Sequence, residues 1–278
     1  MIVSAIPFTG NKRKLWSQIE PLMPEGKCFV DMFMGGGTIA LNATTKYDIV
    51  YAGDVLEPLI CLQLAYKNNP HFIDTVIKLN EHYPSTKEGY LRLREDYNIE
   101  PSPAKLQCLI LRSNTNYMRF NKNGRFNVPY GERNHYNVQR MQDHKSAISS
   151  IEVFNLGYKE LRRQLPSSRG GTTIKPNEYV FYSDCPYQGT TATYCEQGGW
   201  KDSDDEELLK EFLELQGVGC KVVASNVLKN RGVVNKRWVD FCEEYNDKFT
   251  VHHLNRDYNN SSFRKGNGLT DEVLIVSK

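Results

Sequence analysis

The pattern of hydrophobic and polar positions changes its period along the chain. Apolar residues run with little interruption from 28 to 33 and again from 48 to 52, which is typical of buried strands. Three consecutive glycines, at positions 35–37, and a short helix-like stretch, 38–44, lie between the two runs. The N-terminal part of the sequence therefore predicts a strand, a glycine-rich turn, a helix and a second strand.

Helical spacing of apolar residues dominates the segment that follows. It predicts helices over 56–68, 73–83, 85–97 and 104–111, and residues 85–88 resemble a capping box. The period then changes: residues 117–130 alternate around Asn123-Gly124, which is a strong hairpin signal. We expect a helical insert that carries a basic β-hairpin.

Strands and helices alternate again in the last third of the chain. The sequence predicts strands at 179–182, 220–224, 249–254 and 272–276, and helices at 203–215 and 236–245. Such alternation indicates an α/β fold with a mostly parallel sheet. We therefore expect one discontinuous α/β domain, residues 1–60 and 150–278, interrupted by the insert, residues 61–149.

Composition narrows the class of protein. The 278 residues contain no apolar run of the roughly 18 needed to cross a bilayer, and the N-terminus lacks the features of a signal peptide. Seven scattered cysteines without a CxxC pair argue against a disulfide framework or a zinc site. His252 and His253 would point to opposite sides of a strand, so no metal is expected. We expect a cytoplasmic protein without a membrane segment.

Charge is informative only locally. The whole chain carries a net charge of +2, but the segment from 112 to 145 has seven basic and two acidic residues, which leaves +5. A local basic segment indicates a nucleic-acid partner, whereas an ordinary solvated face is the alternative. The basic residues are Arg112, Arg119, Lys122, Arg125, Arg133, Arg140 and Lys145.

The first strand–turn–helix unit has the features of a nucleotide-type ligand site. Glycines allow close approach of the ligand, and Asp54 follows Gly35 by 19 residues, where an acid that binds ribose hydroxyls is expected. The turn is not GxGxxG, so a dinucleotide is not the first choice. A glycine turn in an ordinary α/β protein is the alternative.

The tetrapeptide Asp184-Cys185-Pro186-Tyr187 directly follows a predicted strand. An acceptor carboxylate, a rigid proline turn and an aromatic ring suit a base that has been flipped out of a duplex. The ring can stack on the base, while the carboxylate and a main-chain carbonyl accept the protons of an amino group. A turn with a packed tyrosine is the alternative.

Together these motifs resemble the Dam family of DNA adenine methyltransferases, especially the T-even phage type. The resemblance rests on four stretches in the family's order, which span nearly the whole chain: Ala5–Lys12, Phe29–Gly36, Arg119–Gly131 and Asp184–Tyr187. It implies a Rossmann-like S-adenosylmethionine-dependent methyltransferase sheet in residues 1–60 and 150–278. Residues 61–149 would be the target-recognition domain, with its hairpin at about 117–130.

The resemblance also implies roles for individual residues. Phe8 and Lys12 would contact the cofactor, Asp54 its ribose, and Arg119 a guanine of a GATC target. The catalytic residues would be Asp184, Cys185, Pro186 and Tyr187. The cofactor-binding residues would be Phe8, Thr9, Gly10, Lys12, Asp31, Phe33, Gly35, Gly36, Asp54 and Asp184. The DNA-binding residues would be Thr115, Tyr117, Met118, Arg119, Asn121, Arg125, Pro129 and Arg133.

The implied reaction consumes S-adenosylmethionine and leaves S-adenosylhomocysteine. Its partner would be double-stranded DNA, with no metal and no membrane involved. We expect a monomer in solution, with more than one copy able to bind DNA, in the cytoplasm of a bacterial host if a phage encodes the chain.

One position departs from the family pattern, Asp-Pro-Pro-Tyr: Cys185 stands where the first proline is expected. Its carbonyl can still accept a hydrogen bond, but the fixed φ of proline is lost. A catalytically weakened or inactive DNA-binding homologue is therefore an alternative. Two others are a cytosine C5-methyltransferase with Cys185 as nucleophile and an enzyme that methylates the amino group of cytosine.

Overall fold

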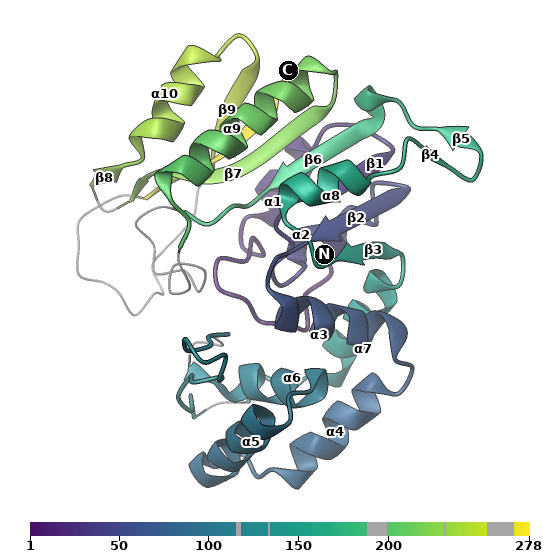
Figure 1. The fold of residues 1–278 in the computed structure, drawn as a ribbon, viewed down its shortest axis with the longest axis vertical. Helices are drawn as coiled ribbons and strands as arrows, with labels where there is room; N and C mark the ends of the chain where they lie inside the picture. The colour runs from purple at the N-terminus through teal and green to yellow at the C-terminus, as the bar shows by residue number, and fades with distance from the viewer. Residues whose placement is uncertain (115–117, 133, 188–198, 231, 255–269) are drawn as a thin grey trace.

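The fold is built on a central sheet of eight strands. The computed structural model describes all residues except 115–117, 133, 188–198, 231 and 255–269. The strand order is β3-β2-β1-β6-β7-β10-β9, and β8 pairs with β7 (Figure 1). The strands are β1 Cys28–Asp31, β2 Ile49–Gly53, β3 Ile151–Phe154, β6 Tyr179–Ser183, β7 Lys221–Asn230, β8 Val233–Val234, β9 Phe249–Leu254 and β10 Asp271–Ser277.

Most of the sheet is parallel, which confirms the predicted fold class. Strands β3, β2, β1, β6 and β7 are parallel to one another, and β10 runs antiparallel between β7 and β9. The carboxyl ends of the parallel strands therefore meet at one edge of the sheet, together with the beginning of β10. In open α/β sheets this edge is the place where ligands bind.

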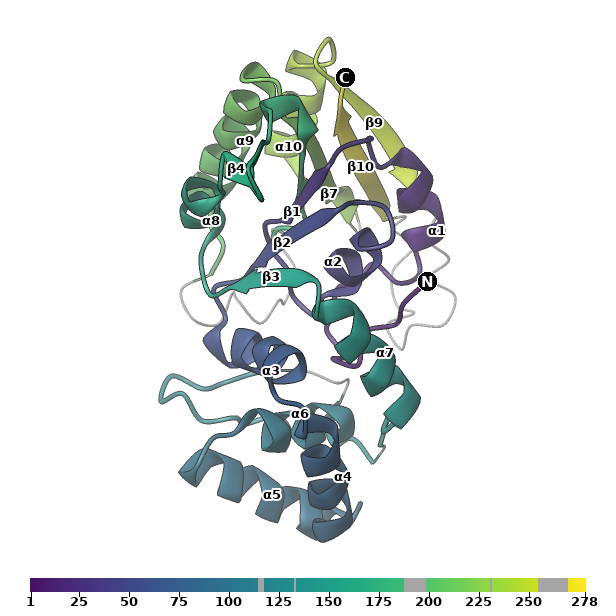
Figure 2. The same cartoon turned by 90° about the vertical axis from the view of Figure 1, so that its right-hand side faces the viewer.

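Helices cover both faces of the sheet (Figure 2). All four residues of β1 are buried: Cys28 and Val30 pack into one core cluster, and Phe29 packs into the other. This explains the nearly continuous apolar run, because a parallel strand with both faces covered exposes no side to water. The covering helices are α1 Trp16–Ile19, α2 Thr38–Ala43, α8 Tyr158–Gln164, α9 Asp202–Gly217 and α10 Lys236–Glu244.

Five helices form a lobe below the carboxyl edge of the sheet (Figure 1). They are α3 Glu57–Asn68, α4 Phe72–His82, α5 Lys87–Ile99, α6 Pro103–Arg112 and α7 Val138–Ile148. Helix α7 had not been predicted. One core cluster joins the sheet to the lobe, since it contains both Phe29 of β1 and Leu93 of α5. None of the helices among the described residues is long and apolar enough to cross a membrane.

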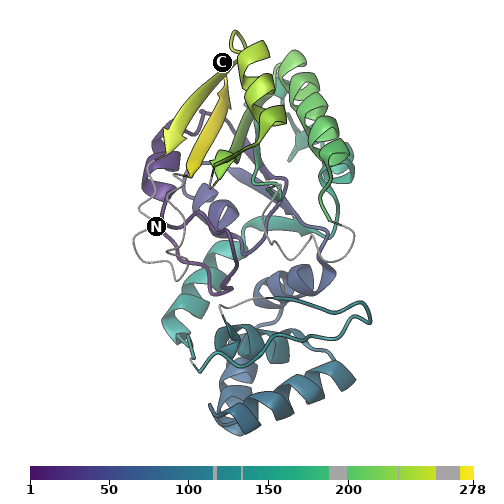
Figure 3. The same ribbon diagram turned by 90° about the vertical axis from the view of Figure 1, so that its left-hand side faces the viewer.

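The predicted hairpin forms only in part. The chain reverses at Gly124, which has φ +71°, but Phe120 and Phe126 make only an isolated bridge. Beyond it the returning arm pairs with the end of α6 instead, through Asn114 N–H to Pro129 O at 2.9 Å. Phe120 and Phe126 are buried against the lobe, so packing on the helices replaces a regular ladder. The described part of this segment projects from one side of the lobe (Figure 3).

Smaller differences concern where elements begin and end. The side chain of Thr86, rather than Ser85, caps α5 by accepting from Gly89 N–H. Strand β7 extends six residues beyond the predicted Ala224, to Asn230, because β10 pairs along its length. Strand β3 and helix α8 were missed, since both are short and lack strong turn signals.

Candidate active site

Acidic side chains gather at the carboxyl edge of the sheet. Asp31 ends β1, Asp54 follows β2, Asp184 follows β6 and Glu272 lies near the start of β10. Asp31, Asp54 and Glu272 are all at most 5% exposed. The topology thus brings together carboxylates from four separate parts of the sequence. Among the described residues, no group of three His, Cys, Asp or Glu side chains could hold a metal ion.

The glycine turn packs directly against the N-terminal segment. A Cβ on Gly36 would lie 2.7 Å from the Cβ of Phe8 and 2.9 Å from the carbonyl oxygen of Ile6, so only glycine fits. Gly35 has φ +49°, and its N–H donates to the Asp54 carboxylate at 2.9 Å. The structure therefore brings together Phe8, Gly35, Gly36 and Asp54, four residues assigned to cofactor binding from the sequence.

Lys12 is the centre of a buried charge cluster. Its ammonium donates to both carboxylate oxygens of Asp184, at 2.6 and 2.7 Å, and lies 3.7 Å from Glu272. It also donates to the carbonyl of Gly10 at 3.1 Å, whereas neighbouring Thr9 is exposed. The Lys12 side chain is only 2% exposed. A cation in this position offsets part of the repulsion between the two carboxylates.

Tyr187 completes the cluster. Its hydroxyl donates to Asp184 Oδ1 at 2.8 Å, and the Lys12 ammonium lies 5.1 Å from the centre of its ring. Burial raises the pKa of Tyr187 well above its usual value, so the phenol keeps its proton. Burial also raises the pKa of Asp184, while the Lys12 ammonium lowers it.

Asp31 is buried close to two other carboxylates. Burial raises its pKa to about 8, and the neighbouring carboxylates of Asp184 and Asp54 raise it as well. The N–H of Phe33 donates to Asp31 Oδ1 at 3.3 Å and opposes this shift. An incoming cation would favour the charged form of Asp31.

Cys185 points away from the acidic cluster. Its side chain is 2% exposed and packs in the core cluster between the sheet and α9, where the Asn226 amide donates to Sγ at 3.6 Å. Burial raises the pKa of the Cys185 thiol well above its usual value. Because the thiolate is the nucleophilic form, this position does not suit covalent catalysis.

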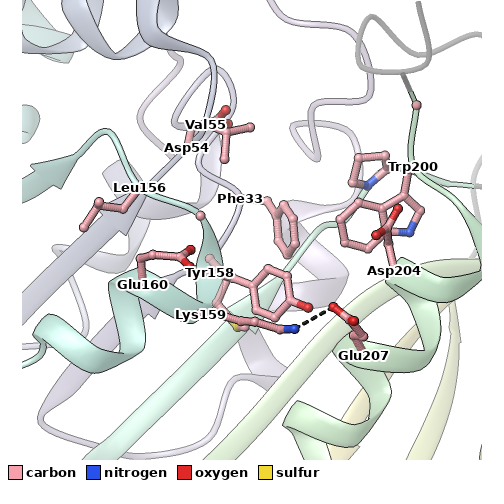
Figure 4. A pocket seen from close by; sticks show the side chains of 14 residues that line it. Phe33, Asp54, Val55, Leu156, Tyr158, Lys159, Glu160, Trp200, Asp204 and Glu207 are labelled. Carbon is pink, nitrogen blue, oxygen red and sulfur yellow. Dashed lines mark hydrogen bonds and ion pairs between the residues drawn. The ribbon is translucent and has the colours of Figure 1, made fainter. Parts of the chain in front are cut away.

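A cavity of about 400 Å³ lies at the same edge of the sheet, since Asp54 and Pro186, the residue two positions after Asp184, are among its lining residues (Figure 4). The ring of Phe33 lies between Tyr158 and Trp200, with centroid distances of 5.6 and 5.5 Å, and Asp54 borders the same space. An aromatic cavity bordered by a carboxylate can hold a ring and its ribose. Tyr158 and Trp200 were missed, because both lie in stretches without a recognisable motif.

The residues assigned to DNA differ in their surroundings. Arg119 donates from Nε to Asn127 Oδ1 at 2.8 Å. Arg125 pairs with Glu95 of α5 at 2.7 Å, and Asn121 accepts from Arg125 N–H within the turn. Pro129 is exposed. Thr115, Tyr117 and Arg133 lie outside the described residues.

Two residues of the basic segment belong to the core of the lobe. Met118 is 2% exposed, a placement that does not favour contact with base pairs. Its role in DNA binding stays a prediction. Arg112 is fully buried and donates to the carbonyls of Asn80 and Tyr83 at the end of α4, at 3.0 and 2.8 Å. Arg112 therefore stabilises the lobe, and its charge does not contribute to a basic surface.

Comparison with known proteins gives a consistent result. Residues 8–260 match the family described as D12 class N6 adenine-specific DNA methyltransferase. The chain is 28% identical to the type II methyltransferase M.FokI of Planomicrobium okeanokoites over 99% of this chain and 43% of that protein. It is 30% identical to the modification methylase LlaI of Lactococcus lactis over 87% of this chain and 39% of that one.

A further relative is shorter. The DNA adenine methylase of Serratia marcescens is 30% identical over 45% of this chain and 48% of that protein. The chain thus spans less than half the length of M.FokI and LlaI. The narrower expectation of a T-even phage type stays a prediction.

Proposed function

Because the chain belongs to the D12 class of N6 adenine-specific DNA methyltransferases, we propose that it transfers a methyl group from S-adenosylmethionine to the exocyclic amino group of adenine in double-stranded DNA. The observation that carries the proposal is the cluster of Asp184, Lys12 and Tyr187 at the same edge of the sheet as an aromatic cavity that Asp54 borders. The catalytic tetrapeptide and the cofactor motifs meet there, although they lie far apart in the sequence.

The cavity fits the adenosine part of S-adenosylmethionine. Phe33, Tyr158 and Trp200 offer aromatic surface for a ring. Asp54 accepts from Gly35 N–H and Leu56 N–H at the border of the cavity, and its carboxylate would also accept from ribose hydroxyls. When bound, S-adenosylmethionine supplies an electrophilic methyl group on a positively charged sulfur.

The methionine end of the cofactor would lie toward the acidic cluster. Asp31 at the end of β1 would accept from its ammonium group, and that cation would favour the charged form of the carboxyl. Phe8 would cover the glycine turn from the other side, since it already packs on Gly35. No step here requires a metal ligand.

Asp184 would position and activate the adenine amino group. Among the described residues, Lys12 and Tyr187 occupy three of its roughly four acceptor positions, so capacity for one amino proton remains. The carbonyl of Cys185 would accept the second proton, and the Tyr187 ring would stack on the base. As the nitrogen–carbon bond forms and the carbon–sulfur bond breaks, one amino proton leaves to Asp184 or to water. Much of the rate would come from holding the reacting atoms in line.

The target base would have to leave the duplex to reach Asp184, as in other enzymes that react on a base. Arg119 would read a guanine of GATC through its major-groove edge. Its Nε donates to Asn127, so the guanidinium already has a defined orientation.

The alternative of an inactive DNA-binding homologue has a specific argument in its favour, the loss of proline at Cys185. Two observations weigh against it. The buried Lys12–Asp184 pair is costly to maintain in a protein that only binds DNA, and the cavity at the same edge of the sheet has no use there. The buried Cys185 thiol weighs against the cytosine C5 mechanism.

The test is transfer of labelled methyl from S-adenosylmethionine to a GATC duplex, beside a duplex with that site scrambled. We expect methylated adenine only in the first duplex. Labelled cytosine in the digested product would contradict the proposed base. Label in neither duplex would leave two explanations, a target sequence other than GATC or an inactive homologue. Label transferred by the Cys185→Pro protein in the same assay would identify the second.

A further inference from the structure

Three helices of the lobe reach the glycine turn and the N-terminal segment through buried polar side chains. They are α3 through Gln63, α6 through Gln107 and α7 through His144, each of them 0% exposed. The reaction proposed above assigns no role to any of the three. Buried polar side chains are costly unless they are paired, so each pairing has to be accounted for.

His144 accepts a hydrogen bond from the main chain. The N–H of Ala5 points to its Nδ1 at 3.2 Å, and its Nε2 lies 2.9 Å from Gln63 Oε1. Since Nδ1 accepts, the neutral ring carries its proton on Nε2 and donates to Gln63. Burial lowers the pKa of His144 to about 3, which agrees with a neutral ring.

Gln63 passes the connection on to the glycine turn. Its Nε2 donates to the carbonyl of Gly35 at 3.2 Å. The order is therefore Ala5 N–H to His144, His144 to Gln63, and Gln63 to Gly35. Ser4 closes the arrangement from the other side, because its hydroxyl donates to the carbonyl of Gly36 at 2.5 Å.

The N-terminal segment is held at a second point. Gln107 donates from Nε2 to the carbonyl of Ala5 at 2.9 Å, so both main-chain groups of Ala5 bond to lobe side chains. Three residues further on, Phe8 packs on Gly35 and Gly36. The two segments that would bind the cofactor thus share one buried polar scaffold.

We propose that Gln63 and His144 are positioning residues for the cofactor site, which they act on through the main chain of Gly35 and Ala5. The inference rests on the proposed function, because it assumes that the glycine turn binds S-adenosylmethionine. Gln63 binds the carbonyl of the peptide unit that follows Gly35, and Asp54 binds the N–H of the unit that precedes it, so the two bonds together restrain φ and ψ of Gly35. Without Gln63 the turn loses one of the bonds that hold this conformation, the one to the Gly35 carbonyl.

The experiment measures binding of S-adenosylmethionine to the full chain by titration calorimetry. Gln63→Leu keeps a similar volume but removes both hydrogen bonds, and it should raise the dissociation constant about tenfold, or about 1.4 kcal/mol. Gln63→Glu keeps the acceptor for His144 and loses the donor for Gly35, so it should weaken binding similarly. This second variant serves where the first fails to fold.

Tyr47→Phe is the matched control. It removes one hydrogen bond of a buried side chain, to the carbonyl of Pro24 at 2.7 Å, away from the glycine turn. It should lower the melting temperature without changing the dissociation constant. If Gln63 had only a structural role, its variants would show this same result.

A double-mutant cycle with His144→Leu tests whether His144 and Gln63 act through the same connection. If the two side chains act through one connection, the double variant should bind about as weakly as Gln63→Leu alone. Unchanged binding by folded Gln63→Leu, beside normal binding by the wild-type chain, would overturn the inference and leave the proposed function intact. A wild-type chain that does not bind S-adenosylmethionine would overturn the proposed function itself.

Discussion

Two ion pairs of nearly equal length lie in two different regions of the molecule. Lys12 and Asp184 meet at 2.6 Å at the carboxyl edge of the sheet, and Arg125 and Glu95 meet at 2.7 Å on the lobe. The exposed fractions of their side chains are 2% and 21% for the first pair, against 45% and 58% for the second. Distance alone therefore says little about what each pair contributes.

Burial decides the difference. Breaking a buried pair leaves an uncompensated charge, which costs about 3–5 kcal/mol, whereas an exposed pair contributes about 0–1 kcal/mol. The charges at the carboxyl edge of the sheet are thus preorganised and depend on one another. The lobe surface presents charges that water can replace, as suits contacts with a DNA backbone.

The largest effect is expected from Asp184→Asn. The variant leaves Lys12 without its main partner and loses the acceptor for the amino group, so kcat should fall by at least about a hundredfold. Methyl transfer to duplex DNA measures it. Glu95→Gln is the matched control on the exposed pair and should keep kcat and stability within about 1 kcal/mol of wild type. Equal losses in the two variants would refute the distinction between the regions.

Asp31 sharpens the comparison through pH. Its pKa is about 8 in the folded chain, against about 3.9 for an unfolded aspartate, so the folded state holds an extra proton between these values. Stability from this group is therefore complete below about pH 4 and is lost as pH rises through 8, at roughly 1.4 kcal/mol per unit at most.

Asp31→Asn removes this titration. The unfolding free energy of the variant, relative to that of wild type, should increase by a few kcal/mol from pH 5 to pH 8. Urea unfolding at each pH measures this difference. The same variant should bind S-adenosylmethionine more weakly, because the amide cannot take a charge opposite the ammonium group. A stability difference that does not vary with pH would show that Asp31 is ionised throughout.

On the lobe, Arg119 and Arg125 can be compared directly. Arg119→Ala should reduce discrimination at one guanine by about 1–3 kcal/mol, since a bidentate base contact is lost. Arg125→Ala should weaken binding evenly across sequences and reduce the salt dependence by about one charge. Methylation rates on duplexes with single substitutions in GATC measure the sequence discrimination of each variant. Loss of discrimination in Arg125→Ala rather than in Arg119→Ala would assign the guanine contact to Arg125.

The two regions also differ in how well the sequence predicted them. Asp54 and Asp184 were found because each follows a buried strand at the ligand-binding edge of the sheet, and the parallel topology brings such positions together. Gly36 was predicted from the glycine-rich turn after a strand, and the structure shows that no side chain fits there beside Phe8. In these cases local chemistry and global fold require the same residue.

The sequence predicted the lobe less well, because the roles of its polar residues depend on contacts between distant segments. Nothing in the local sequence separates Arg112, which is buried at the end of α4, from Arg125, which is exposed. The alternation around Gly124 predicted a ladder, but packing of Phe120 and Phe126 on the lobe left an isolated bridge. His144 and Gln63 carry no motif, since they act through the main chain of other segments.

The smallest effect is expected at Cys185, the position that departs from the family pattern. Cys185→Pro restores the family pattern, and since the Sγ atom lies in the core rather than in the acidic cluster, its loss removes no catalytic group. The fixed φ of proline would hold the catalytic loop more firmly, so kcat should stay equal or rise a few-fold. Methyl transfer by both proteins, with melting temperature as the control for folding, measures the effect. A large fall in kcat with an unchanged melting temperature would mean that the loop needs a φ that proline does not allow, and the Asp184 geometry described above would then depend on cysteine.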